Sequence, residues 1–94
     1  MIVIRNSFIA KPGLAGKLAA HLKETAELGK LANYRILTDV TGDFNHVVME
    51  HEVESLSALE ELLKKYGSDP AIREKSKEYL DLWVTGSREM YRVV

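Results

Sequence analysis

The apolar and polar residues of this chain alternate with two different periods, and the period of each segment predicts its secondary structure. The first ten residues read MIVIRNSFIA, a β-branched run in which every second residue shares a face. Ile2, Ile4, Asn6 and Phe8 form one face, and apolar side chains also occur on the other. A strand with one solvated side shows a cleaner alternation, so we expect this strand to be covered on both sides.

The next segment, residues 14–31, follows the period of a helix. Its apolar stripe recurs every three to four residues, at Leu14, Leu18, Leu22 and Ala26. Pro12 and Gly13 end the strand before it, and Gly29 is a plausible stop signal at its end. His21 falls at the edge of the stripe and is interpreted as a boundary residue. We predict an amphipathic helix that packs on a sheet.

Residues 34–53 have the pattern of a β-hairpin. Two runs rich in β-branched residues flank the turn-forming sequence Thr-Gly-Asp-Phe-Asn at residues 41–45. Gly42 supplies a backbone angle that other residues resist. We expect this hairpin to form the middle of a four-stranded sheet.

The second half of the chain predicts a helix in two parts and a last strand. Ser55 or Ser57 is expected to cap the first part, and Pro70 suits the first turn of the second. The buried stripe of the first part is predicted to comprise Leu56, Leu59, Leu62, Leu63 and Tyr66. The second part is expected to carry Trp83 near its end and to stop at Gly86, before a strand over residues 87–94.

This order of elements predicts an α+β fold in a single domain over residues 1–94. The sequence strand, helix, strand, strand, two-part helix, strand is that of the ferredoxin-like βαββαβ arrangement, with a four-stranded antiparallel sheet. Both crossovers place their helices on the same side of the sheet, which leaves the other face bare. Because soluble monomers avoid large apolar patches, we expect a second copy to cover this face, forming a homodimer that could associate further.

Composition excludes several classes of function. The 94 residues carry 13 basic and 14 acidic side chains, a formal net charge of −1, so nucleic acid and anionic membranes are not expected partners. The absence of cysteine excludes disulfides and thiolate catalysis. The chain begins with a strand-like run and has no long apolar segment, and we expect a cytoplasmic protein.

Three stretches of the chain resemble a known superfamily. They are RILTDVTGDFNHVVME (35–50), ESL (54–56) and GSREMY (86–91), and they are similar to the dimeric α/β barrels. The resemblance is strongest to NIPSNAP-like members and weaker to antibiotic biosynthesis monooxygenases. It implies a dimer in which two sheets face each other. Some members oxidise aromatic substrates without a cofactor, some degrade heme and many have no assigned activity, so the resemblance leaves enzymatic activity open.

Two residues are candidates for catalysis. The position of Asn6 is similar to that of an asparagine that holds an oxygen-bearing group in heme-degrading and quinone-forming relatives. Its alternative is an amide satisfied inside the dimer core. His51 shares a strand face with apolar residues and is a candidate proton shuttle or heme ligand, or else a hydrogen-bonded core histidine.

Three aromatic residues are candidates for a ligand pocket. Trp83 is the only tryptophan and matches loosely the pocket tryptophan of monooxygenase relatives, although it equally suits a packed core. Tyr34 and Tyr91 are expected either to line a pocket or to close the interface between two sheets. The chain lacks the full Asn, Trp and His set of the heme-degrading enzymes.

Charged residues on the strands allow further interpretations. Arginines occur there at Arg5, Arg35, Arg88 and Arg92. We expect them to pair with strand carboxylates such as Glu50, although an arginine at a pocket mouth would attract a carboxylate ligand. His46, Glu50 and Glu52 share a face, but no second histidine joins them at ligand spacing, and no metal site is expected. No cofactor is expected either.

Three functional hypotheses follow. The first is a homodimeric barrel that binds or processes a small, mostly apolar or aromatic ligand between its sheet and helices. The second is a cofactor-independent monooxygenase, acting on aromatic substrates or heme, in which Asn6 orients the substrate and His51 moves a proton. The third is a structural or interaction module without a ligand pocket.

Overall fold

The computed structural model describes all 94 residues. Its helices and strands follow the order β1 (Ile2–Ala10), α1 (Ala15–Leu28), β2 (Arg35–Thr38), β3 (His46–Val53), α2 (Leu56–Ser68), α3 (Pro70–Lys75), the 3-10 helix η1 (Ser76–Asp81) and β4 (Trp83–Arg92). All strand pairs are antiparallel, and the spatial order of the sheet is β2-β3-β1-β4. The predicted α+β, ferredoxin-like fold is therefore confirmed.

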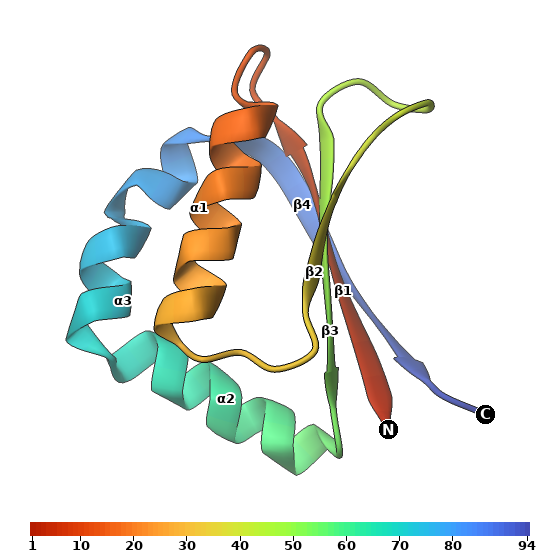
Figure 1. Cartoon of the computed structure of the whole chain (residues 1–94), viewed down its shortest axis with the longest axis vertical. Helices are drawn as coiled ribbons and strands as arrows, with labels where there is room; N and C mark the ends of the chain where they lie inside the picture. The colour runs from red at the N-terminus through yellow and green to blue at the C-terminus, as the bar shows by residue number, and fades with distance from the viewer.

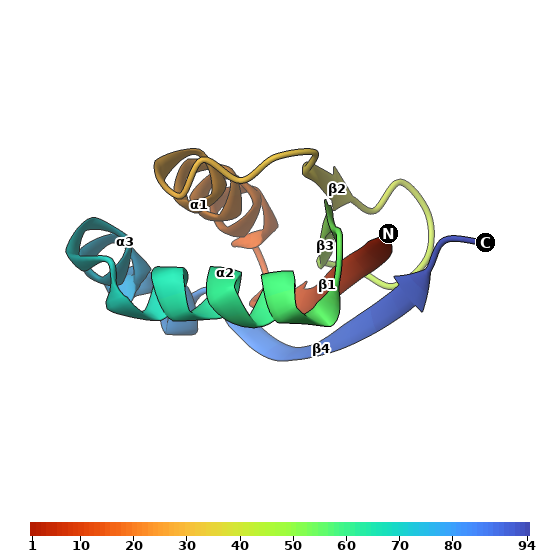
Figure 2. The ribbon, with the colours of Figure 1, turned by 90° about the horizontal axis from the view of Figure 1, so that it is seen from below.

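The helices all lie on one side of the sheet. Figure 1 shows the sheet nearly edge-on, with α1, α2 and α3 to its left, and Figure 2 shows the same layers from below. The two ends of the chain lie beside each other, since the backbone N–H of Val93 donates to the carbonyl oxygen of Met1 at 3.1 Å. No helix combines the length and the apolar run that crossing a membrane would require.

The prediction that the hairpin forms the middle of the sheet is wrong. β2 is an edge strand of four residues, whereas β1 pairs with both β3 and β4 and is central together with β3. β1 is also the strand in which buried and half-buried residues alternate strictly. The two crossovers insert β1 between strands that are distant in sequence, and the local pattern of the hairpin carries no trace of this insertion.

The core lies between the helix-facing side of β1 and β3 and helix α1. One buried cluster contains Phe8, Ala10, Leu18, Leu22 and Val47, and a smaller one contains Ile2, Ile4 and Leu59. The predicted helical stripe of α1 is thus buried from Leu18 to Ala26. On α2, by contrast, only Leu59 is buried, and Leu56 and Leu63 are exposed. The predicted buried stripe of α2 is therefore wrong for these two residues.

The helix starts follow their predicted caps. The Ser55 hydroxyl accepts from the backbone N–H of Ala58 at 3.1 Å, and Pro70 occupies the first turn of α3. The helical segment after Pro70 is shorter than predicted, because η1 replaces its last turns and β4 already begins at Trp83. Gly86 lies within β4 rather than at a helix end. A side chain there would place Cβ 3.0 Å from the Ser7 carbonyl oxygen and 3.2 Å from the Phe8 ring, so glycine lets the strand cross Phe8 closely.

Candidate functional site

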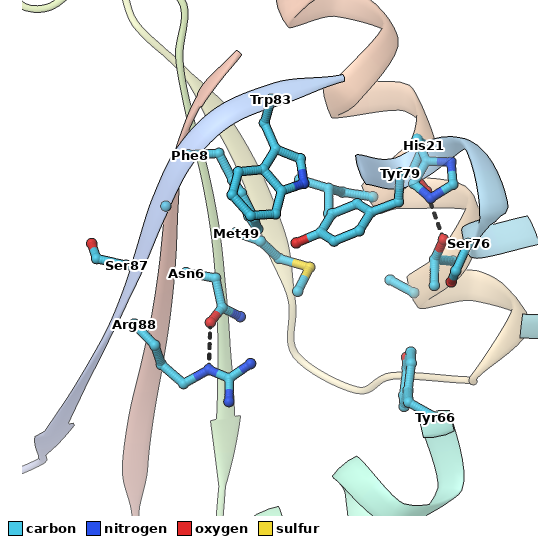
Figure 3. Close-up of a pocket in the computed structure, with 14 residues that line it drawn as sticks. Asn6, Phe8, His21, Met49, Tyr66, Ser76, Tyr79, Trp83, Ser87 and Arg88 are labelled. Atoms are coloured by element: carbon cyan, nitrogen blue, oxygen red, sulfur yellow. Dashed lines mark hydrogen bonds between the residues drawn. The ribbon is translucent and has the colours of Figure 1, made fainter. Parts of the chain in front are cut away.

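A cavity of about 380 Å³ lies between the sheet and the helices. Residues from β1, β3, β4, α1, α2 and η1 line it: Asn6, Phe8, His21, Leu22, Thr25, Ala26, Met49, Tyr66, Ser76, Tyr79, Trp83, Gly86, Ser87 and Arg88. This volume falls within the range of about 300–1,000 Å³ that is typical of small-molecule sites. Figure 3 shows the side chains that surround it.

One wall of the cavity is aromatic. The ring of Phe8 meets Tyr79 edge-on at 5.8 Å and Trp83 at 5.7 Å between ring centroids. Tyr79 and Trp83 are 5.6 Å apart in a tilted arrangement. Phe8 comes from β1, Tyr79 from η1 and Trp83 from the start of β4, so the wall assembles only when the last crossover folds back onto the sheet. Such a wall suits a flat, apolar ligand.

Helix α1 extends this wall with His21. Its imidazole stacks on Tyr79 at 5.8 Å with an angle of 22° between the rings, and the residue is 6 % exposed. Burial lowers the pKa of His21, and the nearby Lys75 ammonium lowers it further. His21 is therefore held as a neutral aromatic wall residue, and the prediction of a boundary position is corrected.

The opposite end of the cavity is polar. The Nε–H of Arg88 donates to Oδ1 of Asn6 across 2.7 Å, and the register of β1 and β4 places these two residues opposite each other. Asn6 is 7 % exposed, while Arg88 is exposed. Both side chains reach toward the cavity from neighbouring strands (Figure 3). The amide of Asn6 thus has a partner within its own chain, on the helix-facing side of the sheet.

His51 lies next to this polar end but not on the cavity wall. It is 5 % exposed and pairs with Ile4 in the register of β1 and β3, two residues along from Met49, which does line the cavity. Its Nδ1 is buried without a hydrogen-bond partner. Burial lowers the pKa of His51, and the positive charge of Arg88 lowers it further, which favours a neutral imidazole.

Two lining residues carry buried polar atoms without partners. They are the hydroxyl of Tyr66 and Nε1 of Trp83. Burial raises the pKa of the Tyr66 hydroxyl, with a further contribution from Tyr34. A buried donor without a partner costs roughly 1–3 kcal/mol, so such atoms are uncommon in cores shaped by packing alone.

Tyr34 and Tyr91 lie outside this cavity. Tyr91 projects from the opposite face of the sheet, where its ring is 5.4 Å from the guanidinium carbon of Arg5 and its hydroxyl donates to Glu89. Tyr34 precedes β2 and its hydroxyl donates to Glu27 at 3.4 Å. Tyr91 misses the cavity because the period of two along β4 sends Arg88 to one face and Tyr91 to the other.

Of the residues that the sequence singled out, the structure brings Asn6, Trp83 and Arg88 to one cavity. It also brings in His21, Tyr66 and Tyr79, which the sequence analysis did not propose as site residues. His21 occurs three residues after Leu18 on the buried stripe, and this spacing was a usable signal. Tyr66 and Tyr79 depend on how α2 and η1 fold back, which no local pattern indicates. No group of three or more His, Asp or Glu side chains is arranged to hold a metal ion.

The sequence matches no protein-family model, and no curated protein is significantly similar to it. Solved structures are similar in fold. A NIPSNAP family protein of unknown function from Agrobacterium tumefaciens has a TM-score of 0.86 at 17% identity, covering 97% of this chain and 86% of that one. An uncharacterised NIPSNAP domain protein from Burkholderia xenovorans has a TM-score of 0.88 at 13% identity, covering 100% and 95%.

A third similar structure has a described activity. The cofactor-independent oxygenase SnoaB from Streptomyces nogalater has a TM-score of 0.74 at 14% identity, covering 99% of this chain and 92% of that one. At these identities the likeness concerns the fold. The predicted likeness in fold to NIPSNAP family proteins is therefore confirmed, and the fold is also similar to that of this oxygenase.

Proposed function

We propose that this protein binds a small, mostly apolar ligand in the cavity between its sheet and helices. The aromatic wall of Phe8, Tyr79 and Trp83 carries this proposal, because it borders about 380 Å³ of space that the protein's own side chains leave empty. A module whose sheet served only as an interaction surface would fill this space with side chains.

The proposal is tested by titrating 2-naphthol into the protein and following amide and indole N–H signals by NMR. The chain has one tryptophan, so the indole signal of Trp83 is a single resonance inside the site. We expect saturable shifts at Asn6, Met49 and Trp83. Shifts confined to the opposite sheet face, around Arg5 and Leu37, or no shifts at all, would overturn the proposal.

A matched pair of variants sharpens this test. Thr25→Phe inserts a ring into the cavity from α1, whereas Thr38→Phe inserts the same ring on the exposed β2, away from the cavity. We expect Thr25→Phe to weaken 2-naphthol binding at least about tenfold, equivalent to 1.4 kcal/mol, and Thr38→Phe to leave it unchanged. Equal binding by both variants contradicts the assignment of the site.

We also propose that two copies pair through the bare face of the sheet. That face carries Val3, Ile9, Leu37 and Val48 without cover from any helix, and Leu37 is 38 % exposed. A second copy, related by a two-fold axis, would bury these residues. Light scattering over a dilution series should give twice the chain mass. A stable monomer at all concentrations would contradict this assembly.

A second candidate function is cofactor-independent oxygenation of the bound ligand. The likeness in fold to the Streptomyces nogalater oxygenase supports it, together with the presence of Asn6 and Trp83 at one cavity. With 1,8-dihydroxyanthrone, dioxygen would convert the ring CH₂ to a carbonyl and release one water. His51, which lies beside the polar end of the cavity but not on its wall, is proposed as the proton acceptor through one intervening water molecule, with its buried, unpartnered Nδ1 as the accepting atom.

This second candidate is tested by oxygen uptake above the rate without protein. Uptake should fall at least about tenfold in Asn6→Ala and in His51→Gln, while 2-naphthol binding in His51→Gln stays intact. Equal uptake by wild type and Asn6→Ala would remove Asn6 from the reaction. No uptake by the wild type would leave ligand binding as the function of the site.

A further inference from the structure

We infer that the ligand of this cavity is an amphipathic anion, with a flat apolar body against the aromatic wall and a carboxylate against Arg88. This inference rests on the proposed ligand-binding function and names the chemical class of the ligand. It begins from the charges that line the cavity. Arg88 carries the only formal charge among the lining residues, none of which is Asp or Glu.

Arg88 has no carboxylate partner, unlike Arg5 and Arg35 on the opposite face of the sheet. Arg5 and Arg35 both bind the carboxylate of Glu50, each with a contact of 2.7 Å. Arg88 forms no salt bridge, and its one side-chain partner is the neutral Oδ1 of Asn6, which engages Nε. The terminal nitrogens of the guanidinium are thereby left for another acceptor.

The hydrogen bond that Arg88 donates to Asn6 also orients the guanidinium. Because Nε is held at 2.7 Å by a buried amide, the guanidinium plane is fixed relative to the sheet. An oriented guanidinium is a fork of N–H donors that matches the two oxygens of a carboxylate. His51 is buried nearby and its Nδ1 has no partner. Its side chain carries no negative charge that would compete with a ligand for the guanidinium of Arg88.

A preference for anions at this cavity would come from Arg88 and not from the charge of the whole protein. The formal net charge of the chain is −1, so the protein as a whole does not attract anions. Selection for an anion must therefore come from Arg88 itself, next to apolar walls that screen charge less than water does. Because Arg88 is exposed to solvent, which weakens its charge interactions, we expect its effect on affinity to be no more than about tenfold.

The experiment compares three probes that share one aromatic body. They are 2-naphthoate, neutral 2-naphthamide and the cation of 2-naphthylmethylamine, each titrated by calorimetry at pH 7.5. We expect 2-naphthoate to bind about tenfold tighter than 2-naphthamide, and the cation to bind weakest. In Arg88→Gln the affinities for 2-naphthoate and 2-naphthamide should become equal, and Arg88→Lys should retain part of the preference for 2-naphthoate.

Arg92→Gln is the matched control. Arg92 lies four residues along β4 on the same sheet face, pairs with Ile2 in register and does not line the cavity. Arg92→Gln changes the net charge by the same amount as Arg88→Gln. Because Arg92 lies outside the cavity, its loss should leave 2-naphthoate binding unaffected. Equal weakening by Arg88→Gln and Arg92→Gln, or equal affinity of the wild type for naphthoate and naphthamide, overturns the inference and leaves ligand binding standing. Binding of none of the three probes contradicts the proposed function itself.

Discussion

Charged side chains have different partners on the two faces of the sheet. On the open face, Glu50 lies between Arg5 and Arg35, and Tyr91 donates to Glu89. On the helix-facing side, Arg88 meets only the neutral amide of Asn6. Both faces are built from the same strands with a period of two, so adjacent residues of one strand serve different environments.

This difference bears on which kind of partner each face can bind. Glu50 is 8 % exposed within one chain, and both of its arginines are already in place. A second copy can therefore cover Glu50 without burying it as an unpaired carboxylate. The helix-facing side keeps an unpaired cation and unpartnered buried polar atoms around an empty space. This arrangement supports the proposal that a small molecule binds on the helix-facing side.

The largest effect is expected from a substitution that disrupts the open face and leaves the helix-facing side unchanged. Val48 lies on the open face, opposite Ser7 and Leu37, and Val48→Lys places a charge on the surface through which the two copies are proposed to pair. We expect the molar mass measured by light scattering to fall from that of a dimer to that of a monomer, because pairing would bury this charge.

The same variant leaves the cavity walls unchanged, so 2-naphthol should still shift the indole signal of Trp83. A matched change, Val84→Lys, introduces the same charge at an exposed position of β4 and should leave the dimer intact. Loss of ligand binding in Val48→Lys would show that the two faces are not independent.

A smaller effect is expected where α1 ends against α2. A Cβ on Gly29 would lie 2.5 Å from Cζ of Tyr66, inside the space that this ring occupies. Gly29→Ala should therefore destabilise the protein by about 1–2 kcal/mol, measured by urea denaturation, and displace Tyr66 at the cavity. Gly16→Ala is the control, since open space surrounds Gly16 within the same helix and alanine there should stabilise by up to about 1 kcal/mol.

The double variant Gly29→Ala with Tyr66→Leu tests whether the ring is the cause. If the clash with Tyr66 explains the loss, the two changes together should cost less than the sum of their separate costs. Additive costs would place the cause in the backbone at the end of α1 instead.

The fold was predictable because its signals are local and repeated. Each of these signals predicts one element. The period of two predicts the first strand, the stripe through Leu18 and Leu22 predicts α1, and the caps at Ser55 and Pro70 predict the starts of α2 and α3. The order of these elements then leaves few topologies. The position of β2 at the sheet edge was missed because strand order depends on the crossovers rather than on the hairpin sequence.

The site was predictable only in part. Asn6 stood out because a lone amide interrupted an apolar face, and a period of two placed it correctly beside Phe8. Trp83 was expected at a helix end, but η1 interrupts the helix and the residue begins β4. Tyr66 and Tyr79 reach the cavity through the packing of α2 and η1, and residues so far apart in sequence leave no common pattern.

The smallest expected effect concerns the paired charges of the open face. Hydrogen bonds from Arg35 and Arg5 hold the pKa of Glu50 below its ordinary value of 4.5. Because the folded pKa is the lower one, the carboxylate stabilises the fold above the unfolded pKa, and this contribution is lost as the pH falls through the folded pKa. The gap in Tm between wild type and Glu50→Gln should thus be a few degrees at pH 6 and close as the pH falls below about 4.5.

Glu52→Gln provides the comparison, since Glu52 is exposed on the same strand and forms no salt bridge. We expect its Tm to follow that of the wild type across the same pH range, measured by circular dichroism. A gap for Glu50→Gln that persists unchanged to pH 3 would mean that packing, not the charge shared by Arg5 and Arg35, is what Glu50 contributes. Packing rather than ion pairing would then stabilise the open face around Glu50. The contrast with the unpaired Arg88 would no longer be an electrostatic one.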